Sequence, residues 1–190
     1  MIPALMPNYA RADLAFDHGE GARLWASDGR RFLDFGAGIA TSSIGHGHPH
    51  LVKAIADQAA KVMHVSNLYR VPQAEELAAR HVANSFADSV LFCNSGAEAN
   101  EGMIKAVRKY HAENGHPERY RTICFEGAFH GRTLAMISAT GNAKYLAGFG
   151  PPVEGFDHVP FNNMNALRDA ITKETAAILI EPIQGEGGVR

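Results

Sequence analysis

The turn Ser95-Gly96-Ala97 is the first candidate site, because it joins an apolar run to a helical pattern. N–H groups at the start of a helix lack intrahelical partners, and the helix dipole adds positive potential there. Gly96 lets an anion approach the backbone and Ser95 supplies a hydroxyl, so the turn is a candidate phosphate site. By spacing alone, a serine before a helix is more often a plain N-cap. The string is neither a Walker loop nor a Gly-x-Gly-x-x-Gly dinucleotide turn.

A second candidate lies just past residues 121–125, where Phe129, His130 and Arg132 stand among glycines. Ligands of open α/β sheets bind beyond the carboxyl ends of the strands, and this string follows an expected strand. The planar fork of Arg132 matches both oxygens of a carboxylate, which makes it a candidate substrate ligand. The alternative interpretation is a core phenylalanine and a surface arginine.

A third candidate follows residues 176–180, where Glu181 and Glu186 lie among a proline and three glycines. Carboxylates at the end of a buried strand are candidate functional groups, although solvated loop acids are more common. The histidines of His46-Gly47-His48-Pro49-His50 invite a metal interpretation. Because no acid or cysteine lies nearby at a usual ligand spacing, we expect a tight turn and no metal.

These strings require a scaffold of strands and helices, which the apolar pattern predicts. A hairpin is expected over residues 23–35 around Asp28-Gly29, followed by an irregular stretch to Pro49. Apolar runs predict strands at 89–93, 121–125 and 176–180. Apolar residues at helical spacing, together with Pro and Asn at expected helix starts, predict helices over 49–62, 72–86, 99–110 and, capped by Asn162 or Asn163, 164–171. Continuous apolar strands alternating with helices indicate an α/β fold with a parallel sheet covered on both faces.

Composition restricts the class of protein further. The chain has 190 residues, of which 46% are apolar. Its net charge of −2 provides no long-range electrostatic attraction for nucleic acid or anionic lipid. We find no apolar run long enough for a membrane-spanning helix and no secretory leader. Cys93 and Cys124 lie in apolar, strand-like runs, so we expect two buried free thiols and a cytoplasmic location.

Taken together, the motifs resemble one family. The strings Asn94–Glu101, Ala128–Thr133 and Glu181–Val189, with the earlier Leu33-Asp34-Phe35 and Gly45–Pro49, are similar to class III (ornithine-type) aminotransferases, which use pyridoxal phosphate. The resemblance covers essentially the whole chain, with the motifs in the right order. It implies the N-terminal part of a type I pyridoxal-phosphate enzyme fold. Residues 1–50 would belong to a small domain, and residues 51–190 to the first part of a large cofactor-binding domain.

The resemblance also implies roles for individual residues. Ser95, Gly96 and Ala97 would hold the cofactor phosphate, and Phe129 would stack on the pyridine ring. Arg132 would bind the substrate α-carboxylate. Glu186 would be the family's movable acid, which pairs with an arginine beyond residue 190 and gates the carboxylate pocket. Glu181 would have a supporting role.

The substrates follow from the same resemblance. The residues of the second and third strings are most similar to those of family members that act on N-acetylornithine. The resemblance implies 2-oxoglutarate as the amino acceptor and a role in arginine biosynthesis. It also implies a homodimer. Related ornithine enzymes carry a substrate-binding tyrosine near Ile39, and its absence favours an N-acetylated donor.

One departure from the family concerns the lysine that forms the Schiff base with the cofactor. In the family this lysine lies well downstream, so it would fall beyond residue 190, and none of the six lysines present has a suitable setting. We therefore expect the chain to be the N-terminal half of an enzyme. Alternatives are another class III enzyme (ornithine, succinylornithine or 4-aminobutyrate), a truncated non-catalytic homologue, and a metal-dependent hydrolase.

Overall fold

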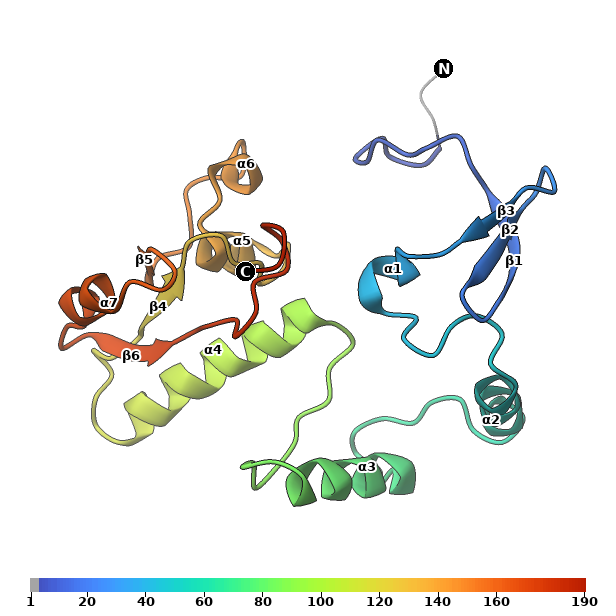
Figure 1. Ribbon diagram of the computed structural model, residues 1–190. Helices are drawn as coiled ribbons and strands as arrows, with labels where there is room; N and C mark the ends of the chain where they lie inside the picture. Colours follow the sequence, from blue (N-terminus) through green and yellow to red (C-terminus); the bar gives the residue numbers. More distant parts are fainter. Residues whose placement is uncertain (1–3) are drawn as a thin grey trace. The chain divides into compact units, whose positions relative to one another are not determined.

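The computed structural model describes residues 4–190 and divides the chain into two compact units (Figure 1). The first unit runs to Leu77, and the second comprises Ala78–Arg190. The division falls inside helix α3 (Pro72–Ala83). This boundary describes contacts within the present chain, and the expected domain boundary at residue 50 stays a prediction.

A three-stranded antiparallel sheet, ordered β1-β2-β3, forms the start of the first unit. Its strands are β1 (Phe16–Glu20), β2 (Arg23–Ala26) and β3 (Arg31–Leu33). The expected hairpin is confirmed, with Gly29 at φ +85° in the turn between β2 and β3. The Asp28 carboxylate fixes this turn by accepting bonds from the backbone and side chain of Arg30. The sequence pattern did not predict β1.

The stretch between the hairpin and Pro49 is irregular, as expected. Its one short helical segment, α1 (Ala37–Ala40), contains Gly38 and Ile39 at positive φ, so it is not a regular helix. Helix α2 (Pro49–Ala59) begins with proline in its first turn, as the pattern predicted. The expected extension to residue 62 is absent, and α3 ends at Ala83 rather than near Phe86.

A three-stranded parallel sheet, ordered β5-β4-β6, organises the second unit. Its strands are β4 (Arg121–Phe125), β5 (Phe156–Val159) and β6 (Thr175–Ile178). The helices are α4 (Gly96–Glu113), α5 (Leu134–Thr140), α6 (Ala143–Leu146) and α7 (Met164–Ala170). The parallel α/β arrangement predicted from the sequence is confirmed.

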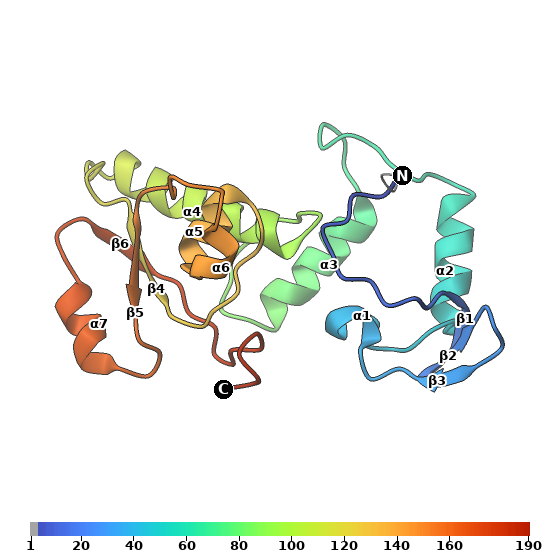
Figure 2. The ribbon, with the colours of Figure 1, turned by 90° about the horizontal axis from the view of Figure 1, so that it is seen from above.

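Strand β4 supplies both halves of the core, because successive side chains of a strand point to opposite faces. Cys124 packs with Ile104 of α4 and Met136 of α5 on one face. Ile123 and Phe125 pack with residues of β5 and α7 on the other. Figures 1 and 2 show α4 and α7 on opposite sides of β4. The central strand is thus covered on both faces, and its carboxyl end leads directly into the loop that carries Phe129.

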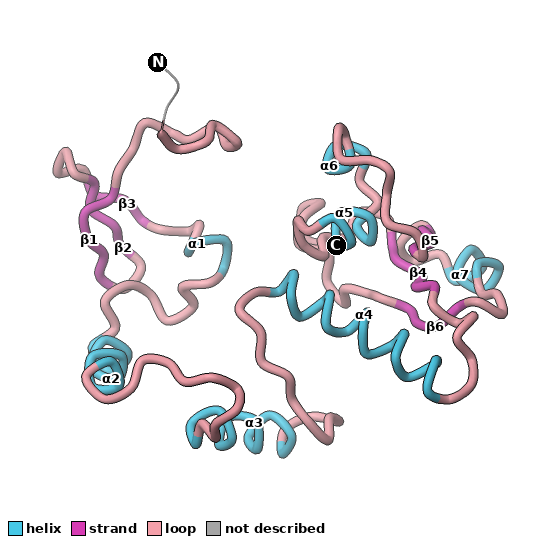
Figure 3. Tube along the Cα trace, turned by 180° about the vertical axis from the view of Figure 1, so that it is seen from behind, coloured by secondary structure: helices cyan, strands magenta, loops and turns pink. Residues whose placement is uncertain are grey.

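Three further expectations, about a strand, a thiol and the buried face of a helix, are also wrong. Residues 89–93 form no strand here and lie in the long loop between α3 and α4 (Figure 3), because no described strand pairs with them. Cys93 is consequently exposed, whereas Cys124 is buried. Helix α4 buries Ile104 and His111, whereas Ala99, Ala106 and Tyr110 on the predicted apolar face are exposed.

Candidate functional site

The start of helix α4 has the geometry of a capped helix. The Ser95 Oγ accepts a bond from the Glu98 backbone N–H at 3.2 Å, and the Ser95 hydroxyl donates to Glu98 Oε2. Bonds from Asn94 and then Ser95 hold the pKa of Glu98 below its ordinary value. The plain N-cap interpretation of Ser95 is therefore confirmed as a structural fact. The N–H groups of Gly96 and Ala97 precede the first intrahelical bond.

The loop carrying the second motif is bound to the first turns of α4 by three contacts. Asn100 Nδ2 donates to the His130 carbonyl at 2.8 Å, and the Thr133 hydroxyl donates to Glu101 Oε1 at 2.6 Å. Gly131 adopts φ +131°, and an added Cβ would lie only 2.7 Å from the Ala97 Cβ. Because Gly131 has no side chain, the loop can pack directly on the turn that contains the candidate phosphate site.

Arg132 of this loop lies over two aromatic rings. Its guanidinium carbon is 4.4 Å from the Tyr145 ring centroid and 5.5 Å from that of Phe129. The Phe129 and Tyr145 rings meet edge to face, with their centroids 6.3 Å apart. The Tyr145 hydroxyl donates to Glu186 Oε1, and this bond raises the pKa of Tyr145 above its ordinary value. Thus Arg132 and Glu186, which are 54 positions apart in the sequence, share Tyr145 as a common neighbour.

The loop after β6 is joined to the loop after β4 by two bonds. The Phe129 backbone N–H donates to Glu181 Oε1 at 3.0 Å, which gives Glu181 a structural contact beside the aromatic ring. Gln184 is 1% exposed, and its Nε2 donates to the Glu126 carbonyl at 3.0 Å. Its Oε1 lies 3.1 Å from the position of an added Cβ on Gly127. The buried amide thus anchors the short segment that ends in Glu186.

His130 is the most buried ionisable side chain of the second motif, at 4% exposure. Burial lowers the pKa of His130, and the nearby Glu181 carboxylate opposes this effect. Its backbone N–H donates to Thr140 Oγ1 at 3.1 Å. Within residues 4–190, the His130 Nε2 and the Glu181 Oε2 are buried without a hydrogen-bond partner. Both atoms are therefore available for a hydrogen bond to a ligand or to another part of the protein.

The geometry fits the cofactor that the resemblance implies. A Cβ added at Gly96 would meet no atom within 4 Å, so an anion has room beside the unpaired N–H groups of the α4 start. Phe129 is 36% exposed, which leaves ring surface for stacking on a flat heterocycle. The Ser95 hydroxyl would donate to the phosphate in place of Glu98. Donors, space and an aromatic face are thus all present on elements that contact one another.

The other candidate residues do not join this cluster. His46 Nε2 bonds to Asp34 Oδ2 at 2.7 Å, and the positive φ of Gly45 and Gly47 makes the expected tight turn before α2. Across residues 4–190 no group of three or more potential metal ligands occurs. The six lysines are all exposed.

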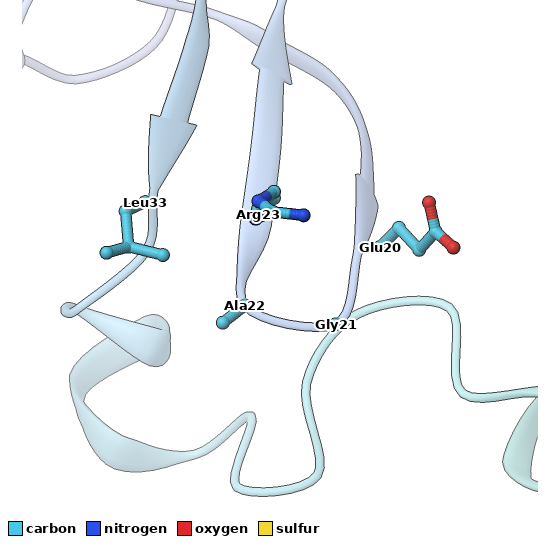
Figure 4. A pocket seen from close by; sticks show the side chains of 5 residues that line it. All are labelled: Glu20, Gly21, Ala22, Arg23 and Leu33. Carbon is cyan, nitrogen blue, oxygen red and sulfur yellow. The ribbon is translucent and has the colours of Figure 1, made fainter.

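A depression of about 380 Å³ at the turn between β1 and β2 is lined by Glu20, Gly21, Ala22, Arg23 and Leu33 (Figure 4). Glu20 points away from Ala22 and Leu33 in this view, so the charged groups do not converge on a ligand position. None of the residues predicted from the sequence to form a site lines it.

The sequence analysis assigned no role to several residues that position the site. Asn100 and Glu101 lie within a motif that it quoted, whereas Tyr145 and Thr140 lie outside every motif. Tyr145 lies on a four-residue helix within a glycine-rich stretch and belongs to no periodic pattern. The one available signal was a polar aromatic residue within a stretch otherwise suited to loops.

The chain matches the family model described as "Aminotransferase class-III" over residues 5–190. It is 61% identical over 188 residues to acetylornithine aminotransferase 1 of Bradyrhizobium diazoefficiens, covering 99% of this chain and 46% of that protein. The chain spans about half the length of the curated relatives it matches.

Solved structures agree with this match. The ornithine aminotransferase of Toxoplasma gondii superimposes with a TM-score of 0.92 at 31% identity, over 98% of this chain and 45% of that one. The N-acetylornithine aminotransferase of Stenotrophomonas maltophilia gives 0.78 at 39% identity, over 95% and 44%. In the described part of the chain, no helix is both long and apolar enough to cross a membrane.

Proposed function

Because the chain belongs to the class III aminotransferases, we propose that it forms the N-terminal part of an enzyme moving the δ-amino group of N-acetylornithine to 2-oxoglutarate. The observation that carries this proposal is the cluster of Phe129, Arg132, Tyr145 and Glu186, bound to the first turns of α4. The names of the relatives support the substrate, since the curated proteins at about 60% identity are acetylornithine aminotransferases.

The cofactor in this proposal is pyridoxal 5′-phosphate. When bound, this cofactor would supply an aldehyde for the amino group and a ring that withdraws electrons from the reacting carbon. The N–H groups of Gly96 and Ala97 and the Ser95 hydroxyl would hold its phosphate, where the helix dipole favours an anion. Phe129 would fix the plane of its ring. No lysine of this chain serves as the covalent anchor, which we assign to the part of the enzyme after residue 190.

The substrate is held by its carboxylate in this proposal. Arg132 would bind the α-carboxylate through two parallel N–H donors, a geometry that matches both oxygens of the carboxylate. Glu186 would act as the movable acid that gates the carboxylate pocket, paired with an arginine beyond residue 190. Glu181 would support the ring by holding the Phe129 backbone N–H.

The larger assembly is also part of the proposal. We assign residues 1–50 to the small domain and residues 51–190 to the first part of the cofactor-binding domain. We propose a homodimeric, cytoplasmic enzyme of arginine biosynthesis that binds neither nucleic acid nor membranes. The net charge of −2 supports the absence of polyanionic partners.

The test is an assay of the purified whole enzyme with pyridoxal phosphate and 2-oxoglutarate against four donors. The donors are N-acetylornithine, N-succinylornithine, ornithine and 4-aminobutyrate. We expect a cofactor absorption band in the visible range and the highest kcat/KM with N-acetylornithine. A higher kcat/KM with another donor would identify that donor as the substrate and keep the assignment to the family. Absence of both the band and amino transfer would leave the non-catalytic homologue as the better description.

A further inference from the structure

Two consecutive side chains of helix α4 hold the loop on either side of Arg132. Asn100 Nδ2 donates to the carbonyl of His130, two residues before the arginine, at 2.8 Å. Glu101 Oε1 accepts from the hydroxyl of Thr133, one residue after the arginine, at 2.6 Å. Asn100 and Glu101 are half-buried, whereas the Arg132 side chain is exposed. The chain on each side of the arginine is thus bound to the first turns of α4.

Two further contacts fix the same part of the loop. Gly131 lies between the two bonds at φ +131°, and an added Cβ there would be 2.7 Å from the Ala97 Cβ, so the loop touches the start of α4 directly. Thr133 Oγ1 also accepts from the Met136 N–H at 3.2 Å and caps helix α5. The Thr133 hydroxyl therefore uses its hydrogen on α4 and its oxygen on α5, and it joins the loop to both helices.

We propose that Asn100 and Glu101 are positioning residues that set the spacing between the cofactor-phosphate site at the start of α4 and the Arg132 guanidinium. This inference rests on the proposed function. The two side chains lie about one turn into the helix whose first N–H groups would hold the phosphate. The same helix would therefore bind the cofactor and hold the loop that binds the substrate carboxylate. Such spacing matters because misplacing a binding group by about 1 Å can lower a rate about 100-fold.

The test is steady-state kinetics on the whole enzyme with its cofactor, N-acetylornithine and 2-oxoglutarate. Glu101→Ala removes the acceptor of the Thr133 hydroxyl, whereas Glu101→Gln keeps a carbonyl oxygen that can accept the same bond. We expect Glu101→Ala to raise KM for both substrates about tenfold, because the loop loses one hydrogen bond to a charged group. Glu101→Gln should restore KM to within about threefold of the unmutated enzyme, since a neutral acceptor makes a weaker bond. The dissociation constant of the cofactor should change less than about twofold, because its phosphate contacts would lie on α4 itself.

A double-variant cycle shows whether Glu101 acts through Arg132. In an Arg132→Lys background the planar fork is already gone, so Glu101→Ala should alter KM less than about twofold. Asn100→Ala in the unmutated background should raise KM in the same direction, because it releases the other side of the arginine. An equal rise for Glu101→Ala in both backgrounds would overturn the positioning role.

Glu113→Ala is the matched control. Glu113 lies on the same helix and pairs with Lys109 outside the site, so KM for both substrates should stay unchanged. A KM for Glu101→Ala within about twofold of the unmutated enzyme, or equal losses in Glu101→Ala and Glu101→Gln, would also overturn the inference.

Hydrogen exchange gives a second measurement that needs no activity. In the whole enzyme without substrate, mass spectrometry would follow the amides of residues 129–134. Glu101→Ala should speed their exchange at least about threefold, and Glu101→Gln and Glu113→Ala should leave it unchanged. Unchanged exchange in Glu101→Ala would overturn this inference alone. Absence of amino transfer by the unmutated enzyme would instead overturn the proposed function, which distinguishes the two failures.

Discussion

Replacing Arg132 by lysine is the most informative single change in the candidate site. Lysine keeps the positive charge but loses the planar fork that binds both oxygens of a carboxylate. Arg132 is exposed and lies over the rings of Tyr145 and Phe129, so its guanidinium is held in place by stacking rather than by burial. Folding should therefore be nearly unaffected, whereas recognition of the substrate should suffer.

The magnitude follows from the loss of one charged hydrogen bond. Such a bond contributes about 1.5–3 kcal/mol, and each 1.36 kcal/mol corresponds to a factor of ten, so kcat/KM should fall about 10- to 150-fold. We expect this loss for both N-acetylornithine and 2-oxoglutarate, because each presents a carboxylate to the same arginine.

Steady-state kinetics on the whole enzyme, with the thermal midpoint measured in parallel, is the assay. Arg168→Lys on α7 is the matched control, since Arg168 is also exposed but lies outside the cluster. A value of kcat/KM within twofold of the unmutated enzyme for both substrates would refute the carboxylate role of Arg132. A large fall in the thermal midpoint would instead show that Arg132 has a structural role.

The remaining predictions concern stability, thiol reactivity and covalent labelling. Arg121 donates to Asp157 and lowers the pKa of that carboxyl in the folded protein. The stabilisation is therefore complete above the unfolded pKa of about 4 and is lost as pH falls through the folded value. Asp157→Asn should thus lower the denaturation midpoint at pH 7, and by progressively less as the pH falls below the unfolded pKa, and a loss independent of pH would contradict the ion pair. In the native 190-residue chain a thiol reagent should modify the exposed Cys93 but not Cys124, whose pKa burial raises to about 12; two fast-reacting thiols would show that β4 is accessible. Borohydride reduction of the same chain with pyridoxal phosphate should label no lysine stoichiometrically, and one fully labelled lysine with amino transfer would contradict the assignment of the anchor elsewhere.

Elements with a local signal were predictable from the sequence. Pro49 marked the start of α2, and Asn163 caps α7 by accepting from the Ala166 N–H at 3.1 Å. Strand β4 was found because Ile123, Cys124 and Phe125 form a continuous apolar run at its carboxyl end. In these cases the residues that specify the element lie within the element itself, so no tertiary information is needed.

Features that depend on residues far along the chain, and that have no local signal, were not predictable. Strand β5 was missed because Asp157 and His158 interrupt its apolar pattern. Their partners are Arg121 and the Ala139 carbonyl, which only the fold brings near. Cys93 was expected to be buried, but burial needs a covering element that the described chain does not supply. For the site, the motif residues were found from their types and spacing, whereas the position of Tyr145 depends on contacts of α6 with two loops that lie far apart in the sequence.

Transfer of a labelled nitrogen tests the proposed activity most directly. The whole enzyme would be incubated with pyridoxal phosphate, 2-oxoglutarate and N-acetylornithine carrying ¹⁵N at the δ position, and the glutamate formed would be analysed by mass spectrometry. Our account predicts that the glutamate carries the label in proportion to the donor consumed, and that Arg132→Lys slows its appearance. Cofactor-loaded enzyme that produces no labelled glutamate would contradict the assignment of N-acetylornithine as the amino donor.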